Sequence, residues 1–329
     1  MLSEVTRQEA KLDLSIQHFR SKAYSDNSKQ AYKAMRNCYL RFCVYFGYKP
    51  VPIHQAVLTR YVVFLSRTLR PTSISSYLNV IRIIHLEAGL SNPLQQNWLV
   101  DSVIKGIKRE LGTPPSKKLP ITPQILQCMV KKLDLQKTQD LAFWAACLCA
   151  FFCFFRKSTL LPKSVCQFNS DKDLTRKDVK FMEQFAVLTV KQSKTLQFGD
   201  RSLQIPLPRI TSSVLCPVTA LEKLFAIGKV IPLSAPLFSY PDKGDDYRII
   251  THSSFVSKLR SVLHACDMNT SAYSGHSFRR GGASFAFACG VPTSIIKLQG
   301  DWKSSAYEGY ITAPLDLRMK LSRALSLKL

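Results

Sequence analysis

Residues 274–291 read SGHSFRRGGASFAFACGV, and residues 298–311 read LQGDWKSSAYEGYI. In the first stretch, His276 and Arg279 lie one helical turn apart, a spacing that lets both side chains face the same phosphate. The same spacing also arises by chance. The alternative is a histidine at a helix start beside a solvated basic pair, Arg279 and Arg280. The motif therefore needs support from other parts of the chain.

If this histidine and arginine served to cleave DNA without a metal ion, other parts of the chain would have to supply the remaining catalytic groups. A nucleophile attacks phosphorus, a donor protonates the leaving sugar oxygen, and fixed cations neutralise charge on the equatorial oxygens. Arginine suits the last task because its guanidinium contacts two oxygens at once and stays charged when buried. Two arginines, a lysine, a histidine and a tyrosine would therefore suffice.

Together, the two quoted stretches resemble the C-terminal signature of the phage-integrase-like tyrosine recombinases, and most closely those of eukaryotic DIRS- and Ngaro-type retrotransposons. The resemblance implies that His276 and Arg279 are the paired catalytic residues. It places Trp302 where many members have histidine and some have tryptophan. It implies Tyr310 as the nucleophile, since an apolar residue and the segment TAPLDLR follow it. Tyr310 lies one residue closer to Trp302 than in phage and bacterial members, so Tyr307 remains a competitor.

A basic residue follows a long apolar run further upstream. The stretch FFCFFRKSTLL, residues 151–161, resembles the helix that delivers the family's first catalytic arginine, which implies Arg156. A charge at the end of an apolar helix is costly to bury without a partner, and a phosphate would serve as that partner. Many family members have an acidic residue three positions later to hold this arginine. Here that position is Thr159, which puts such support in doubt.

The catalytic lysine is sought between two short β-rich runs, residues 185–190 and 202–208. The connection TVKQSKTLQFGD resembles the family's β2–β3 turn and implies Lys194, with Lys191 as the near rival. The alternative is a solvated hairpin lysine. A turn at Gly199-Asp200 would join the strands, and a third strand is expected near DVKFM.

The fold class expected from these patterns is mainly α with a small antiparallel β-sheet. Residues 1–110 read as an all-helical core-binding domain that clamps DNA, and residues 111–121 as a proline-rich linker. Residues 122–329 read as a mixed α+β catalytic tyrosine recombinase domain with a C-terminal tail helix. After Cys216-Pro217 we expect only helices. The leucines of the tail, at positions 317, 321 and 325, suit docking on its own domain or on a neighbouring protomer.

Apolar periodicity places the helices of the first domain. They are expected near residues 3–22, after Ser25 or Asp26, from Pro52, and from a cap at Thr72 or Ser73, with a shorter one near residues 97–111. The fourth of these, in RPTSISSYLNVIRIIH, resembles the family's DNA-contacting helix. The candidate DNA-binding residues are Thr72, Ser73, Ser76, Lys117, Lys118 and Arg280. For the hydroxyl residues, ordinary helix capping is the alternative.

Composition favours a polyanionic partner. The formal net charge is +24, which costs self-repulsion unless a polyanion such as nucleic acid binds, although a generic basic surface would show the same charge. The ten cysteines include no CxxC pair, so we expect free thiols, with Cys147, Cys149 and Cys153 in the core and no metal site. No membrane-spanning run or secretory signal is apparent, which predicts an intracellular, nuclear protein.

The function expected is a site-specific DNA recombinase or integrase of a mobile element, acting through a 3′-phosphotyrosine intermediate without any cofactor. Its partners would be double-stranded DNA and further copies of the chain, as a dimer on one site and a tetramer in synapsis. Two alternatives are a domesticated DNA-binding protein that no longer cleaves and a type IB topoisomerase. Every proposed catalytic position holds a competent residue type, and the helical first domain and the tail argue against the topoisomerase.

Overall fold

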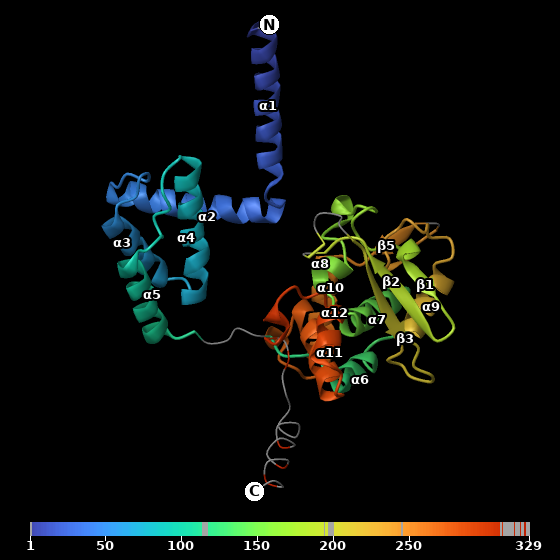
Figure 1. Cartoon of the computed structure of the whole chain (residues 1–329). Helices are drawn as coiled ribbons and strands as arrows, with labels where there is room; N and C mark the ends of the chain where they lie inside the picture. The colour runs from blue at the N-terminus through green and yellow to red at the C-terminus, as the bar shows by residue number, and fades with distance from the viewer. Residues whose placement is uncertain are drawn as a thin grey trace. The chain divides into compact units, whose positions relative to one another are not determined.

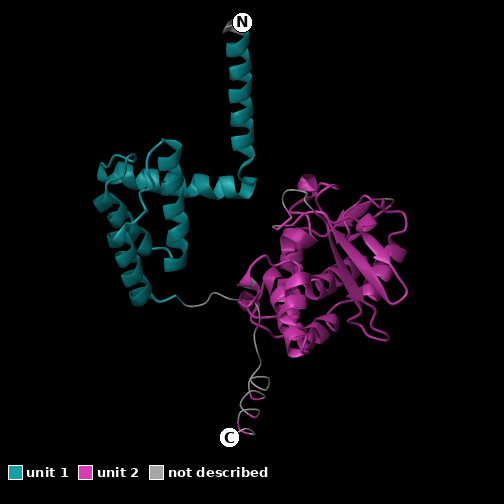
Figure 2. Cartoon of the chain, in the orientation of Figure 1, with its two compact units in different colours: residues 1–116 teal, residues 117–329 magenta. Residues whose placement is uncertain are grey.

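A computed structural model describes residues 2–113, 118–193, 195–196, 201–244, 246–309, 311, 319, 323 and 326. The chain forms two compact units, Met1–Ser116 and Lys117–Leu329 (Figure 2). The division between them falls within the stretch predicted as a linker, residues 111–121.

The first unit is all-helical (Figure 1). Its helices are α1 (Leu2–Lys22), α2 (Asp26–Phe46), α3 (Gln55–Ser66), α4 (Pro71–Glu87) and α5 (Trp98–Leu111). Helices α2 to α5 enclose an apolar core that includes Tyr39, Phe42, Tyr61 and Ile74. The apolar stripe predicted along residues 32–46 supplies part of this core, because side chains three and four positions apart share one helix face.

Local chemistry sets where these helices begin. The Ser25 side chain accepts a hydrogen bond from the Ser28 backbone N–H, which confirms a serine cap for α2. The third helix begins at Gln55 and not at Pro52, because the side chain of His54 caps it. The fourth begins at Pro71, so the predicted caps Thr72 and Ser73 are wrong. Proline favours the first helical position, since its missing N–H would have no partner there.

The second unit combines helices with two small sheets. Its helices are α6 (Pro123–Val130), α7 (Thr138–Phe152), α8 (Lys157–Leu160), α9 (Pro217–Ile227), α10 (His252–Ala265), α11 (Gly275–Ala288) and α12 (Thr293–Gln299), with 3-10 turns at Val165–Gln167, Arg176–Asp178, Thr270–Ala272 and Ser305–Tyr307. Its strands are β1 (Val179–Phe181), β2 (Phe185–Val190), β3 (Leu203–Pro208), β4 (Ser239–Pro241) and β5 (Tyr247–Ile249). The expected fold class, mainly α with small antiparallel sheets, is confirmed.

The three-stranded sheet has the order β1-β2-β3, and both pairings are antiparallel. The predicted hairpin and its third strand are therefore confirmed, with Val190 opposite Leu203 at the end that leads into the connection. The predicted turn residues Gly199 and Asp200 lie outside the described residues. The expectation that only helices follow residue 217 is wrong, because β4 and β5 form a second hairpin. Each of these strands has three residues, too few to show an alternating pattern.

Helix α7 lies at the centre of the second unit, in contact with α9 and α11 (Figure 1). Every residue from Asp140 to Phe151 is buried, as expected for a helix that is apolar on all sides. Cys147, Cys149 and Cys153 are fully buried, which confirms their place in the core, and burial raises the pKa of each thiol. All ten cysteines are described and none is bridged. Within the described part of the chain, no helix has the length and apolarity required to span a bilayer.

Candidate active site

Arg279 lies at the centre of the candidate site. It points from the first turns of α11, whose start is capped by the Ser274 side chain, and only 2% of its surface is exposed. Its guanidinium donates one hydrogen bond to the Phe154 carbonyl and another, of 2.8 Å, to the Gly300 carbonyl. The same group lies over the Trp302 ring, 3.7 Å from its centroid. One side chain therefore joins two segments separated by more than a hundred residues in the sequence.

Two glycines let α11 approach its neighbours closely enough for these bonds. A Cβ atom at Gly281 would lie 1.7 Å from the Ile121 carbonyl oxygen, and one at Gly282 would lie 2.1 Å from the Phe151 carbonyl oxygen. Both distances are far below van der Waals contact. The GG pair that follows Arg279 and Arg280 is thus required by close backbone packing.

The segment after α7 carries Arg156 to the same region. Arg156 is half-buried at the start of α8, two residues after the Phe154 carbonyl that accepts from Arg279. Its neighbour Lys157 packs on the first turn of α11, where a Cβ at Gly275 would lie 3.1 Å from the Lys157 Cβ. Among the described residues, the Arg156 side chain forms no hydrogen bond or ion pair.

The acidic residue that the motif resemblance would place three residues after Arg156 is absent here, since Thr159 holds that position. Thr159 is buried, and its backbone N–H donates to the Arg156 carbonyl, 2.9 Å away. It therefore stabilises the turn of the backbone and supplies no charge to the guanidinium.

His276 is exposed on the first turn of α11, one turn before Arg279. Its backbone N–H donates to the Ser274 hydroxyl, which closes the start of the helix. The predicted spacing of His276 and Arg279 on one helix thus holds, and their environments differ. The histidine is open to solvent, whereas the arginine is enclosed.

Trp302 packs against the Arg279 guanidinium. It is buried, and it belongs to a small apolar cluster with Phe154, Ala283 and Ile296. Tyr307 is half-buried and packs against this cluster, with its ring centroid 6.3 Å from that of Trp302. Packing thus accounts for the position of Tyr307. Tyr310, the other candidate nucleophile, lies outside the described residues.

The connection between β2 and β3 turns back toward the same site. The backbone N–H of Leu196 donates to the Ser193 carbonyl, which closes a four-residue turn, and the Leu196 side chain is fully buried in the core. Lys194 stands inside this turn in the sequence and lies outside the described residues. Its rival, Lys191, donates to the Ser170 carbonyl and forms an ion pair of 2.8 Å with Asp178. Lys191 is thus engaged in holding the sheet to the segment before it.

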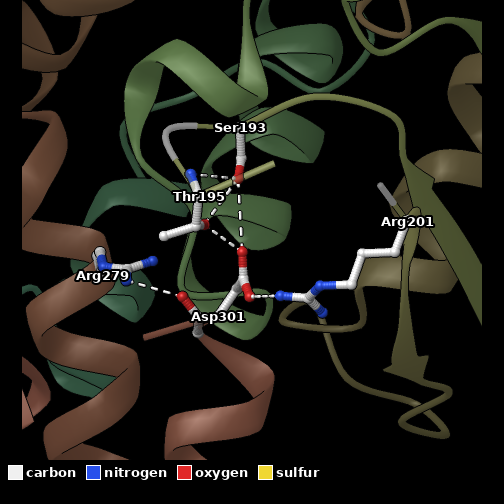
Figure 3. A network of polar contacts seen from close by, with 6 residues as sticks. Ser193, Thr195, Arg201, Arg279 and Asp301 are labelled. Atoms are coloured by element: carbon white, nitrogen blue, oxygen red, sulfur yellow. Dashed lines mark hydrogen bonds and ion pairs between the residues drawn. The ribbon is translucent and has the colours of Figure 1, made fainter. Parts of the chain in front are cut away.

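A carboxylate joins this turn to the Arg279 site (Figure 3). Asp301 accepts hydrogen bonds from the Thr195 hydroxyl and, at 3.5 Å, from the Ser193 hydroxyl. Its other oxygen forms an ion pair of 2.5 Å with Arg201. Burial would raise the pKa of the Asp301 carboxyl, but these hydrogen bonds and the Arg201 charge outweigh burial and hold the pKa below its usual value.

Sequence reasoning missed Asp301, Thr195 and Arg201. Asp301 stood within the quoted motif, directly before Trp302, and its backbone adopts the left-handed conformation with φ of 49°. The signal in the sequence that could have identified Asp301 is an aspartate directly before a motif residue, Trp302. The partners could not be identified, because they lie about a hundred residues away in the sequence.

The predicted DNA-binding residues fall in both units. On α4, Thr72 and Ser76 are exposed and Ser73 is half-buried, and their hydroxyls bond to no described residue. In the second unit, the Lys118 ammonium donates to the Ser271 carbonyl at 2.6 Å, and Arg280 donates to the Lys118 carbonyl. These two side chains tie the start of the unit to the region around α11. Lys117 and the tail leucines lie outside the described residues.

No metal-binding cluster forms among the residues that the structure describes, where no three His, Cys, Asp or Glu side chains converge. The polar groups that do converge are the Arg279 guanidinium, the Asp301 carboxylate with its partner Arg201, and the hydroxyls of Ser193 and Thr195. Arginine side chains suit an anionic group such as a phosphate diester.

Comparisons with known proteins find similarity in structure and none in sequence. No protein-family model matches the chain, and no curated protein is similar to it in sequence. The Tn1549 transposon integrase in complex with transposon right end DNA has a TM-score of 0.61 and 11% identity, covering 95% of this chain and 98% of that chain. The XerH site-specific recombinase bound to a palindromic difH substrate has a TM-score of 0.54 and 12% identity, covering 83% and 70%. A lambda integrase dimer bound to a COC′ core site has a TM-score of 0.54 and 13% identity, covering 92% and 95%. The chain therefore has the fold of these site-specific recombinases and integrases.

Proposed function

We propose that this chain is a tyrosine recombinase that cleaves and rejoins DNA strands through a 3′-phosphotyrosine intermediate. One observation carries the proposal. The Arg279 guanidinium bonds to the backbone two residues before Arg156 and two residues before Trp302, while Asp301 holds the turn that contains Lys194 in the sequence. The segments that carry Arg156 and Trp302 thus meet at one buried cation, and the turn is joined to them through Asp301. The shared fold supports the same conclusion.

The two arginines stabilise charge on the phosphorane. Arg279 is oriented by two backbone carbonyls and by the Trp302 face, so its guanidinium is already in place when charge develops on the phosphate. Arg156 is half-buried, follows by two residues the Phe154 carbonyl that holds Arg279, and has no described partner, which leaves its donors for phosphate oxygens. Trp302 therefore acts by supporting Arg279.

The strand transfer itself proceeds in two balanced steps. The phenol oxygen of Tyr310 attacks phosphorus, the bond from phosphorus to the 5′ oxygen breaks, and Lys194 protonates that oxygen as it leaves. His276 assists removal of the phenol proton. The 5′-hydroxyl of a second strand then attacks the phosphotyrosine and gives its proton back to Lys194, the bond from phosphorus to the phenol oxygen breaks, and Tyr310 regains its proton. The covalent link conserves the bond energy, so no nucleotide is consumed.

Double-stranded DNA is the proposed substrate, held by both units of this chain, whose formal net charge is +24. The exposed hydroxyls of Thr72 and Ser76 on α4 would donate to backbone phosphates, which positions DNA without reading its sequence. A dimer on one site and a tetramer in synapsis, joined through the tail, complete the proposal. The proposal also includes an origin in a mobile element of the DIRS or Ngaro type, which the resemblance of the motif implies, and a nuclear location.

The test is incubation of the chain with a nicked DNA substrate in the absence of magnesium, followed by denaturing electrophoresis. We expect a covalent protein–DNA adduct that Tyr310→Phe abolishes and Tyr307→Phe retains. Tyr307→Phe is the matched control, since it also removes a phenol hydroxyl, from a tyrosine three residues before Tyr310. Loss of the adduct only with Tyr307→Phe would reassign the nucleophile. Strict dependence on a divalent ion would overturn the mechanism.

Assays on the same purified chain distinguish two alternative functions. A DNA-binding protein that no longer cleaves would bind DNA and form no adduct. A type IB topoisomerase would relax supercoiled DNA as a monomer and would not join strands from two sites.

A further inference from the structure

We propose that Asp301 is a positioning residue for the general acid Lys194. Its carboxylate holds the turn from Ser193 to Leu196 against the Arg279 site. This inference rests on the proposed function and adds to it a residue that acts through another. Asp301 itself contacts the turn and Arg201, and it is not placed in contact with DNA.

The contacts on one side of Asp301 are all to the connection between β2 and β3. Thr195 and Ser193 donate to one carboxylate oxygen, and Arg201 pairs with the other at 2.5 Å. Ser193 and Thr195 are the two chain neighbours of Lys194. Because consecutive Cα atoms lie about 3.8 Å apart, anchoring both neighbours restricts where the chain between them can run.

The two chain neighbours of Asp301, and not Asp301 itself, contact the cation that would bind the phosphate. Asp301 follows Gly300, whose carbonyl accepts from Arg279 at 2.8 Å, and precedes Trp302, which stacks on the same guanidinium. A shift of the Asp301 backbone would therefore move the turn and the Arg279 site together. This coupling suits a reaction in which an acid and a cation act on neighbouring oxygens of one phosphate.

The chemistry of Asp301 fits a fixed anchor. Its side chain is only 11% exposed, and the hydrogen bonds and the Arg201 charge that lower its pKa keep it ionised at neutral pH. Its left-handed backbone conformation, with φ of 49°, favours aspartate or asparagine over most other residues. Asp301→Asn therefore retains the backbone preference and one acceptor oxygen while it removes the charge.

The experiment distinguishes loss of general-acid catalysis by Lys194 from loss of the Arg279 site. Two nicked DNA substrates are compared under single turnover, one natural and one with sulfur in place of the bridging 5′ oxygen at the scissile phosphate. A thiolate leaves without a proton, since a thiol has a pKa of about 8.5, so the sulfur substrate does not need Lys194. DNA affinity and thermal unfolding are measured for each variant.

Asp301→Asn is expected to slow cleavage of the natural substrate by about tenfold, the cost of a misplaced catalytic group, and to leave cleavage of the sulfur substrate nearly unchanged. Lys194→Ala should show the same selectivity with a larger loss, of about a hundredfold. Glu222→Gln is the matched control. It breaks the ion pair between Arg209 and Glu222, of 2.6 Å, at the far end of β3, and both substrates should be cleaved at the normal rate.

Equal loss on both substrates would show that Asp301 acts on the arginine site or on general stability, and would overturn the inference. So would normal cleavage of the natural substrate by Asp301→Asn. If the unmodified chain forms no adduct with either substrate, the proposed function fails as well. That result is distinct from a selective failure of this variant.

Discussion

Substitution of Gly282 by alanine tests the packing that places the candidate site. A Cβ at this position would lie 2.1 Å from the Phe151 carbonyl oxygen and 2.6 Å from the nearest atom of the Phe154 ring. Ordinary contact begins near 3.4 Å, so helix α11 would have to move by about 1 Å or more away from the end of α7. The Phe154 carbonyl accepts from Arg279, and the same movement would disturb the site.

The expected magnitude follows from two opposing effects. Alanine is favoured over glycine inside a helix by about 1 kcal/mol. Overpacking against backbone that cannot yield costs about 1–3 kcal/mol and at times more. The 2.1 Å approach to a backbone oxygen places the cost at the upper end of that range, about 3 kcal/mol. After the gain of about 1 kcal/mol, we expect Gly282→Ala to lower the free energy of unfolding of the second unit by about 2 kcal/mol. The matched control is Gly106→Ala in α5, where nothing lies within 4 Å of the added Cβ, and which should gain about 1 kcal/mol.

Hydrogen exchange in increasing denaturant, followed by mass spectrometry of peptides, measures the opening of each unit separately. Gly282→Ala should also slow formation of the covalent adduct, whereas Gly106→Ala should not. Stabilisation of the second unit by Gly282→Ala, comparable to the gain from Gly106→Ala in the first, would refute the close approach of α11 and α7. Destabilisation without any effect on cleavage would instead refute the link from this packing to Arg279.

Three further changes probe the site and the DNA contacts. Arg279→Lys should reduce adduct formation by about a hundredfold, since an ammonium lacks the planar fork that spans two carbonyls, and DNA affinity measured by filter binding should change far less. The pKa of Asp301 is lower in the folded chain than in the unfolded chain, where it is about 3.9. Its contribution to the free energy of unfolding is therefore complete above the unfolded pKa and is lost as pH falls through the folded pKa. Acid titration of unfolding should therefore show a shallower loss below pH 4 for Asp301→Asn, and an unchanged slope would contradict the anchor. Thr72→Ala combined with Ser76→Ala should weaken DNA binding by about 1 kcal/mol for each lost phosphate contact and leave unfolding unchanged, while unaltered affinity would remove α4 from the interface.

Local patterns in the sequence predicted much of the secondary structure. Apolar residues at three- and four-residue steps predicted the helices of the first unit, and two β-rich runs predicted the hairpin of β2 and β3 within a residue of its bounds. The places where this reasoning was wrong were also local. Pro71 started α4 one residue before the expected cap, and the short β4–β5 hairpin had too few residues to show alternation.

The candidate site was predictable in its residue types and not in its contacts. The spacing of His276 and Arg279 on one helix held, yet the sequence alone could not choose between Lys191 and Lys194. The structure shows Lys191 engaged with Asp178, an ion pair across 13 positions of the chain. The structure also identified Asp301 as part of the site, although no spacing in the sequence had indicated this residue.

What the sequence by itself determined are the properties that depend on near neighbours: the helices, the hairpin, the proline-rich division and the net positive charge. What only the tertiary structure decided is how Arg279 bonds to the carbonyls of Phe154 and Gly300, and how Asp301 holds Thr195. The physical reason is that helix periodicity and capping arise within a few residues, whereas these hydrogen bonds form only after distant segments have packed. Their geometry depends on the close approach that Gly282 permits between α11 and α7.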